Sequence, residues 1–260
     1  MDRAISPIGV LDSGVGGVYV LRQAVRLMPR ENFIFYGDLG NAPYGSRPLE
    51  EIRRISLAAA QRLAGQGVKA LLVACNTATS AAVDTMRERF SIPVVGVEPA
   101  LKPAMEARKN GKIAVMATPA TLRLPRFARL MQACGLKDAL VPLPCPGLSL
   151  MVERYGPGSG VISDYLAELF SHAPLDQLDG VVIGCTHYSY LKGDLRAMLG
   201  GGVPLFDGAA GAARQLERVL RQQGLLREQE GAIRFETSGG PEGTALMERF
   251  YALAEEMGDD

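Results

Sequence analysis

Two cysteines of this chain stand at matching points in two similar stretches of sequence. Cys75 closes the apolar run ALLVAC and Cys185 closes the run GVVIGC, and polar residues follow each of them. A thiolate on one face of a carbon atom and a thiol on the other can invert that carbon, because one removes a proton while the other delivers one. The ordinary pKa of cysteine, about 8.5, lets either group hold or release a proton near neutral pH. The pair therefore predicts proton transfer at a carbon atom.

The chain has two further cysteines, and neither stands in such a context. Cys134 and Cys145 are interpreted as structural, because cysteine is commonly a small buried apolar residue. The same interpretation is open for Cys75 or Cys185 taken alone, and it is their matching positions that favour chemistry. A disulfide between them is disfavoured, because a substrate between the thiols would keep their Cα atoms beyond the limit of about 7 Å for a bridge. No CxxC pair occurs and the chain has only 2 histidines, so no metal site is expected.

Short apolar runs alternate with amphipathic stretches along the whole chain. The expected strands are 8–14, 32–38, 69–75, 92–98, 111–118, 179–185 and 203–208, and the expected helices include 18–28, 50–67, 78–90, 121–135 and 190–199. Such alternation predicts parallel sheets with right-handed crossovers. Ligands bind beyond the carboxyl ends of the strands in these sheets, which is where Cys75 and Cys185 fall. The positive end of the following helix dipole favours a thiolate or an anionic ligand at that point.

The second half of the chain repeats the first. Three pairs of segments recur in the same order at nearly the same spacing: 8–14 with 113–119, 70–80 with 180–190, and 92–100 with 203–211. We therefore predict an α/β fold of two similar parallel-sheet domains related by an approximate two-fold axis, with the active site in the cleft between them. The first domain is expected to comprise residues 1–98 and 208–260, with helices in its tail, and the second residues 99–207.

The composition is that of an ordinary globular protein. Hydrophobic residues make up 47% of the chain, and 28 basic residues balance 28 acidic ones. This balance gives no reason to expect a nucleic-acid or an anionic-membrane partner. No stretch approaches the roughly 20 apolar residues of a membrane helix, and the N-terminus lacks the pattern of a signal peptide. We therefore expect a cytoplasmic protein; the sequence leaves its oligomeric state open, with a homodimer as one option.

Motifs spread over nearly the whole chain resemble those of the glutamate racemase family, within the aspartate/glutamate racemase superfamily. They are DSGVGG (12–17), YGDLGNAPYGSR (36–47), ACNTAT (74–79), GCTHY (184–188) and TSGGPE (237–242). The resemblance implies an isomerase that interconverts L-glutamate and D-glutamate without a cofactor and supplies D-glutamate for peptidoglycan. Neither a metal nor pyridoxal phosphate is expected to take part. The glycines of the first motif do not have the GxGxxG spacing of a nucleotide site, and we interpret them as a tight turn close to the substrate.

The resemblance also implies roles for individual residues. Cys75 resembles the base that deprotonates D-glutamate, and Cys185 resembles the base that deprotonates L-glutamate. Asp12 resembles a residue that assists a thiol, and Glu153 and His187 resemble acid–base helpers near the thiols. The residues implied to bind the substrate are Asp12, Ser13, Tyr44, Gly45, Asn76, Thr77, Thr121, Thr186 and His187.

Structural interpretations stand beside these roles. Asp12 and Ser13 are also typical helix N-caps. Tyr44 could be a turn aromatic, and His187 a hydrogen-bonded histidine in the cleft wall.

The chain also departs from the family pattern. Ser189 stands where proline is usual, Leu124 and Phe127 stand for a serine and a tyrosine, Gly208 and Ala209 follow Asp207, and the stretch around Glu153 differs.

Three other functions remain open. An aspartate racemase would use the same two thiols, because selectivity depends on the length of the pocket. An amino-acid-binding or gyrase-interacting module would show only secondary catalysis. A thiol redox protein would form a cross-link between the two cysteines on oxidation.

Overall fold

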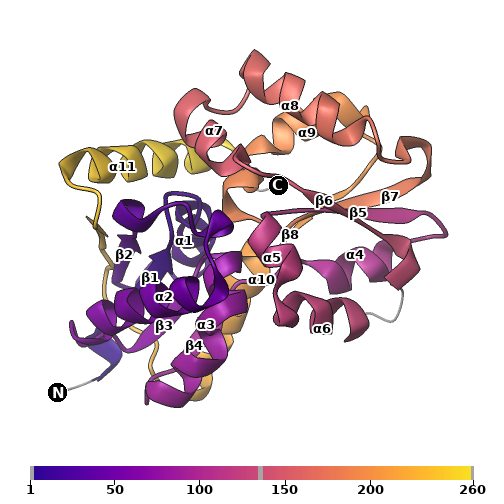
Figure 1. Ribbon diagram of the computed structural model, residues 1–260. Helices are drawn as coiled ribbons and strands as arrows, with labels where there is room; N and C mark the ends of the chain where they lie inside the picture. The colour runs from indigo at the N-terminus through magenta and orange to yellow at the C-terminus, as the bar shows by residue number, and fades with distance from the viewer. Residues whose placement is uncertain (1–2, 134–136, 259–260) are drawn as a thin grey trace.

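The computed structural model describes residues 3–133 and 137–258, so Cys134 lies outside the described residues. Within them the chain forms two sheets whose neighbouring strands all run parallel (Figure 1). The first sheet contains β1 (Ile8–Asp12), β2 (Phe33–Gly37), β3 (Ala70–Val73), β4 (Val94–Gly96) and β9 (Ile233–Thr237). The second contains β5 (Lys112–Ala117), β6 (Leu140–Pro144), β7 (Leu178–Ile183) and β8 (Leu205–Asp207).

The two sheets share one strand order. The first sheet has the order β4-β3-β1-β2-β9, and the second, read from its other edge, has the order β8-β7-β5-β6. Strands β1 to β4 therefore correspond one by one to β5 to β8, as the repeated segments of the sequence predict. The predicted fold of two similar parallel-sheet α/β domains is confirmed, and β9 is an addition at one edge.

Helices cover both faces of each sheet (Figure 1). Those around the first sheet are α1 (Val18–Leu27), α2 (Leu49–Ala64), α3 (Asn76–Arg89), α10 (Ala209–Gln222) and α11 (Pro241–Glu256). Those around the second are α4 (Leu101–Ala107), α5 (Pro119–Arg123), α6 (Pro125–Ala133), α7 (Leu148–Tyr155), α8 (Gly160–Phe170) and α9 (Lys192–Leu199). Among the described residues, none of these helices combines the length and the apolar character needed to cross a membrane.

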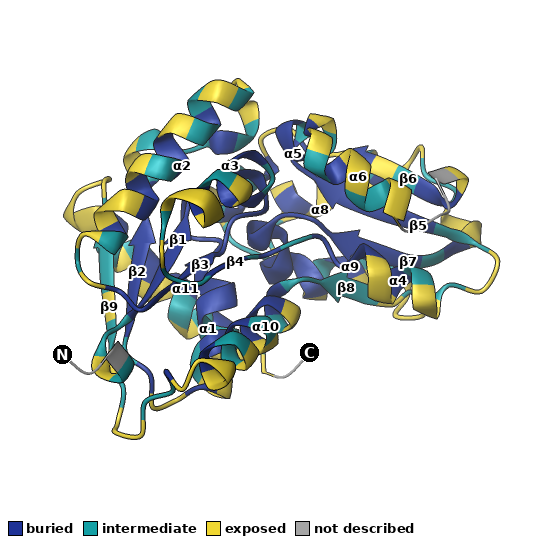
Figure 2. Ribbon diagram, turned by 90° about the horizontal axis from the view of Figure 1, so that it is seen from below, coloured by how far each residue is buried: buried dark blue, intermediate teal, exposed yellow. Residues whose placement is uncertain are grey.

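Side chains of each strand alternate between the two faces of its sheet, and both faces are apolar. Val10 and Leu72 pack in the cluster that contains residues of α1, α10 and α11. Their neighbours Leu11 and Leu71 pack in a separate cluster with residues of α2 and α3. Figure 2 accordingly shows the inner strands as buried elements between helices whose outer faces are exposed, while the edge strands β8 and β9 are partly exposed. Burial on both faces is what a parallel sheet between two helical layers requires.

One apolar core extends through both halves of the molecule. Met116 of β5 and Ile183 of β7 belong to the same cluster of contacting residues as Val10 of β1 and Leu216 of α10. The other face of the second sheet packs separately, under α4 and α6. Because the shared core lies between the sheets, the two halves bury apolar surface against one another.

The structure corrects the sequence analysis at the helix predicted for residues 121–135. The chain leaves the helical conformation at Leu124, whose ψ is 142°, and α6 begins at Pro125. A residue before proline is disfavoured in the helical region, because the proline ring clashes with it. The prediction of one continuous helix was therefore wrong, and α5 ends at Arg123.

Several elements were not expected from the sequence. Strand β6 contains Pro142 and Pro144, which argue against a strand, but it lies at an edge of its sheet where a missing N–H is tolerated. Strand β9 was missed because the tail 208–260 was expected to add helices alone; it pairs with β2. Helices α4, α7 and α8 were also absent from the expected elements.

A buried ion pair joins four distant segments at the amino ends of the first sheet's strands. Lys69 Nζ lies 2.5 Å from Glu31 Oε2, and both side chains are almost fully buried. The same ammonium donates to the carbonyl oxygens of Ala4 and Leu225, at 2.7 and 2.8 Å. Glu31 in turn accepts from the Arg227 amide at 2.9 Å. The pair thus ties the N-terminal segment and the chain after α10 to the sheet.

We expect Lys69→Ala to lower the free energy of unfolding by about 3–5 kcal/mol, because it leaves a carboxylate buried without its cation. Denaturant titration measures the change. Lys102→Ala is the matched control: Lys102 lies 4.0 Å from Glu106 with 82% of its side chain exposed, and an exposed pair contributes little. Equal stability of the Lys69 variant and the wild type would refute a stabilising role for this pair.

Candidate active site

The two cysteines singled out by the sequence lie at equivalent points of the two sheets. Cys75 follows β3 as the N-cap of α3. Cys185 follows β7 as the N-cap of a 3₁₀ segment, η6 (Thr186–Leu191). Both residues line one cavity between the domains, with exposed fractions of 5% and 8%. The carboxyl ends of parallel strands thus bring two thiols from different halves of the chain to a common space.

The cavity is narrow, and both domains line it. Its volume is about 20 Å³, which is room for about one water molecule. Of the predicted site residues, those that line it besides the two cysteines are Ser13, Tyr44, Gly45, Asn76, Thr77, Glu153, Thr186 and His187. Asp12 and Thr121 are fully buried, and neither is part of that lining.

The thiol of Cys75 is held by neighbours from the first domain. The Ser13 hydroxyl lies 3.4 Å from Cys75 Sγ. The amide of Ala78, in the first turn of α3, donates to the same sulfur over 3.4 Å. A hydroxyl and a helix N-terminal amide are both able to stabilise a thiolate when the proton leaves.

The thiol of Cys185 begins a chain of three titratable groups. His187 Nδ1 lies 3.9 Å from Cys185 Sγ. The other ring nitrogen, Nε2, lies 2.7 Å from Glu153 Oε1 on α7. His187 is 4% exposed, so the imidazole is fixed between a sulfur and a carboxylate with little access to water.

Asp12 connects the first domain to the segment after Cys185. Its Oδ1 accepts from the Gly14 amide at 2.7 Å, and its Oδ2 accepts from the Thr186 hydroxyl at 3.2 Å. Gly16, four residues after Asp12, lies against the same segment. A Cβ atom added to Gly16 would lie 2.6 Å from the backbone nitrogen of His187 and 2.7 Å from Thr186 Oγ1. The glycine-rich turn therefore allows this loop to pack directly on η6.

Three threonine hydroxyls bridge the domains beside Cys75. Thr77 Oγ1 lies 3.2 Å from Thr118 Oγ1 and 3.0 Å from Thr121 Oγ1, and Thr118 donates to Thr121 over 3.0 Å. Thr121 therefore supports the cavity wall from behind. Asn76 lines the cavity and is 4% exposed, and its Oδ1 has no hydrogen-bond partner among the described residues. A buried acceptor without a partner is rare in folded proteins and is suited to a ligand that donates.

The sequence analysis did not predict the lining residues Ala42, Pro43, Thr118, Ser149 and Leu150, nor Asp38 behind Tyr44. Thr118 lines the cavity and caps α5 by accepting from the Thr121 amide. Asp38 accepts a 2.6 Å hydrogen bond from the Tyr44 hydroxyl, so Tyr44 offers the cavity its ring and backbone. Asp38 also accepts from the Ser238 hydroxyl of the tail motif at 2.6 Å. Thr118 and Asp38 each follow a strand directly, at the same ends of the sheets as the cysteines, and that position was the signal that could have identified them.

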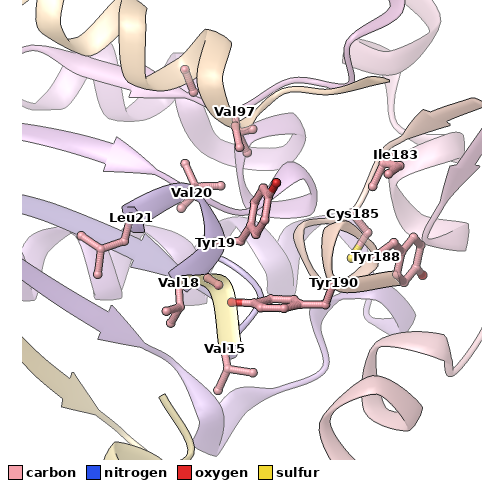
Figure 3. Close-up of a cluster of buried hydrophobic side chains, with 14 of the residues drawn as sticks. Val15, Val18, Tyr19, Val20, Leu21, Val97, Ile183, Cys185, Tyr188 and Tyr190 are labelled. Carbon is pink, nitrogen blue, oxygen red and sulfur yellow. The ribbon is translucent and has the colours of Figure 1, made fainter. Parts of the chain in front are cut away.

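The space behind Cys185 is filled by aromatic side chains (Figure 3). The Tyr188 hydroxyl donates to the carbonyl of Cys145, and Tyr190 packs edge-on against Tyr19 of α1 with ring centroids 5.6 Å apart. Cys145 is itself buried, and its thiol donates to the Leu143 carbonyl. Cys185 thus packs in a buried cluster with aromatic side chains that come from both domains.

Comparison with known proteins assigns the chain to a family. The sequence model of the family described as Asp/Glu/Hydantoin racemase matches residues 8–216. The chain belongs to this family. The glutamate racemase of Clostridium acetobutylicum is 44% identical over 236 residues, which cover 90% of this chain and 92% of that protein. The recognition made from the motifs is therefore confirmed, and the protein is an isomerase of the amino-acid racemase class.

Solved racemase structures agree with this assignment. Glutamate racemase from Thermus thermophilus, in complex with β-chloro-D-alanine, has a TM-score of 0.80 and 37% identity, covering 98% of this chain and 94% of that one. Glutamate racemase from Francisella tularensis, in complex with D-glutamate, has a TM-score of 0.84 and 27% identity, covering 96% of this chain and 94% of that one. Leu124 and Phe127, where this chain departs from the family's serine and tyrosine, are both buried apolar side chains.

The two thiols of the racemase have different electrostatic surroundings. Burial raises the pKa of Cys75 to about 12, and the nearby Asp12 carboxylate adds to the rise. On the other side, burial opposes a charged imidazole, but the hydrogen bonds to Cys185 and Glu153 outweigh it and hold the pKa of His187 well above its ordinary value. Burial would raise the pKa of Glu153, yet its hydrogen bond to His187 lowers it overall. A histidine whose raised pKa favours its cationic form therefore stands beside Cys185. Near Cys75 stands Asp12, whose own pKa is raised by burial.

We expect iodoacetamide to alkylate Cys185 before Cys75 when the racemase is treated near neutral pH. Alkylation requires the thiolate, and burial, followed by the Asp12 carboxylate, raises the pKa of Cys75 to about 12. Cys185 instead has the His187 ring 3.9 Å from its sulfur. Mass spectrometry of peptides after brief treatment measures the order. Faster modification of Cys75 would show that the two surroundings do not act in this way.

Proposed function

We propose that this racemase interconverts L-glutamate and D-glutamate by a two-base mechanism that uses no cofactor. The observation that carries the proposal is that Cys75 and Cys185, from opposite domains, line the same cavity. A substrate α-carbon between them would present one face to each sulfur. Each direction of the reaction then uses one thiolate as base and the opposite thiol as acid.

In the direction from L-glutamate, the Cys185 thiolate removes the α-proton and becomes a thiol. The Cys75 thiol delivers its own proton to the opposite face and becomes a thiolate, so one proton enters the carbon for each that leaves. The His187 imidazolium stabilises the Cys185 thiolate before the transfer, and the pKa of Cys75 near 12 keeps that residue protonated. In the direction from D-glutamate, Ser13 and the Ala78 amide stabilise the Cys75 thiolate.

Polar groups on the cavity wall are proposed to hold the substrate. The unpartnered Oδ1 of Asn76 accepts from the α-ammonium. The Thr77 hydroxyl donates to the α-carboxylate, Thr186 lines the same wall while its hydroxyl donates to Asp12, and the Tyr44–Gly45 backbone receives the side-chain carboxylate. Hydrogen bonds to the α-carboxylate and the exclusion of water would stabilise the carbanion that forms between the two transfers. Support comes from the related Francisella structure, which holds D-glutamate.

The wider role is part of the same proposal. D-glutamate made by this reaction would serve peptidoglycan synthesis in the cytoplasm.

We also propose the domain division given by the sequence, 1–98 with 208–260 and 99–207. It is supported by the strands, since β1 to β4 and β9 make one sheet and β5 to β8 make the other.

Circular dichroism of an L-glutamate solution containing the purified protein tests the substrate. We expect the signal to decay to zero, and the same end point from D-glutamate, because enantiomers have equal free energy. Aspartate is the parallel substrate, and it should react far more slowly. Faster reaction with aspartate would replace the proposal by an aspartate racemase, and no reaction with either amino acid would favour the amino-acid-binding module.

A further inference from the structure

A second cavity adjoins the cavity of the two thiols on its outer side. Its volume is about 270 Å³, against about 20 Å³ for the inner cavity. The two cavities share the lining residues Pro43, Gly45, Thr118, Ser149 and Leu150. The outer cavity thus has space for a small molecule, whereas the inner cavity that it adjoins has almost no free space.

The outer cavity carries one unpaired positive charge. Arg123, the last residue of α5, lines it and is exposed. Among the described residues that line this cavity, Arg123 is the only charged one. Its guanidinium has no hydrogen-bond or ion-pair partner in the described part of the chain, unlike Arg126 on the next helix, which pairs with Asp84 over 2.9 Å.

The inner cavity offers no comparable charge. Its described lining contains neither lysine nor arginine, and its histidine, His187, is paired with Glu153 at 2.7 Å. Glutamate carries a net negative charge, whereas glutamine has nearly the same shape and none. Hydroxyls and backbone amides alone discriminate weakly between the two, because each can also donate to an amide oxygen. A cation just outside the inner cavity would therefore add to the selection for charge.

We propose that the outer cavity is the vestibule through which substrate reaches the thiols, and that Arg123 selects anionic amino acids there. This inference rests on the proposed glutamate racemisation. A guanidinium binds a carboxylate through two parallel hydrogen bonds. Arg123 at the rim can hold the substrate while the inner cavity opens, and it then remains outside the space where the α-carbon reacts. Because Arg123 lies outside the inner cavity, it does not place a fixed cation beside the α-carbon, where such a charge would favour one enantiomer over the other.

Arg123→Gln tests the vestibule. We expect KM for L-glutamate and for D-glutamate to rise about tenfold, the loss of roughly one charge-assisted interaction, while both kcat values stay within about twofold of wild type. Because the equilibrium constant is one, kcat/KM must fall equally in both directions whatever the cause. The informative quantities are therefore kcat and KM taken separately.

Salt and a conservative variant separate charge from structure. In the wild type, KM should rise with added sodium chloride, because salt screens the exposed guanidinium; in Arg123→Gln this dependence should be weak. Arg123→Lys should recover most of the loss in KM, and relative turnover of glutamine should increase in Arg123→Gln. Arg89→Gln, at the exposed end of α3, is the matched control and should behave as wild type.

The inference and the proposed function fail in different ways. If the wild type does not racemise glutamate, the proposed function is lost and the vestibule with it. If the wild type racemises glutamate while Arg123→Gln keeps both the wild-type KM and its salt dependence, the vestibule is overturned and the function stands. A fall in kcat at unchanged KM would likewise overturn it, since Arg123 would then act on the reaction itself.

Discussion

Replacing Cys75 or Cys185 by alanine should abolish racemisation in both directions. Each thiol is the only proton donor or acceptor proposed for its face of the substrate, and the loss of one therefore stops inversion from either side. We expect kcat to fall at least about a thousandfold, within the range known for general acid–base groups. The decay of the circular dichroism signal of L-glutamate and of D-glutamate measures the loss.

Serine variants refine this result. Cys75→Ser and Cys185→Ser should leave at most a trace of activity, because a hydroxyl is a far weaker acid than a thiol and does not supply the base near neutral pH. Both variants should keep the wild-type thermal unfolding midpoint within a few degrees, since the change of one atom leaves the packing intact. A double alanine variant that still interconverts the enantiomers at the normal rate would refute the two-thiol mechanism.

His187→Asn should lower kcat about a hundredfold, the second largest effect that we expect. Asparagine fits the space but cannot become the cation that stabilises the Cys185 thiolate, which lies 3.9 Å from the imidazole in the wild type. Glu153→Gln should have a smaller effect of the same kind, because it removes the carboxylate that raises the pKa of His187. In both variants Cys185 should be alkylated more slowly than in the wild type, because the cation 3.9 Å from its sulfur is lost or weakened. Unchanged alkylation and kcat in His187→Asn would remove His187 from the mechanism.

The His187–Glu153 pair should also contribute to stability over a defined range of pH. The pKa of His187 is raised on folding, so its contribution is complete below its unfolded pKa of about 6.5 and is lost as the pH rises through the folded value. The pKa of Glu153 is lowered, so its contribution is present above its unfolded value of about 4.3 and is lost as the pH falls through the folded one. The stability difference between the wild type and His187→Asn should therefore be largest between about pH 4.3 and 6.5.

The sequence predicted those features of the fold that follow from repetition. Cys75 and Cys185 end equivalent strands of two parallel sheets, and topology alone brings the carboxyl ends of such strands to the ligand side. The predicted division into domains and the roles of individual residues stay predictions. The residue roles depend on the substrate and on measurements of activity.

Features that depend on tertiary contacts were harder to predict from the sequence. The prolines of β6 are tolerated because the strand lies at an edge, and the order of strands in a sheet is not visible in the sequence. Asp38 was missed because its partners, Tyr44 and Ser238, come together only when the tail folds onto the first domain. Arg123 falls within the helix predicted for residues 121–135, and its place at the rim of a cavity goes with the break at Leu124.

Hydrogen exchange at the α-carbon tests most directly whether the two sulfurs act on opposite faces. In deuterium oxide, Cys75→Ala should introduce deuterium into L-glutamate alone, because Cys185 still removes and returns a proton on its own face. Cys185→Ala should label D-glutamate alone, and neither variant should produce the other enantiomer. Proton magnetic resonance of the α-hydrogen, with chiral separation, follows both outcomes. Labelling of both enantiomers by either variant would contradict the opposed arrangement of the two thiols.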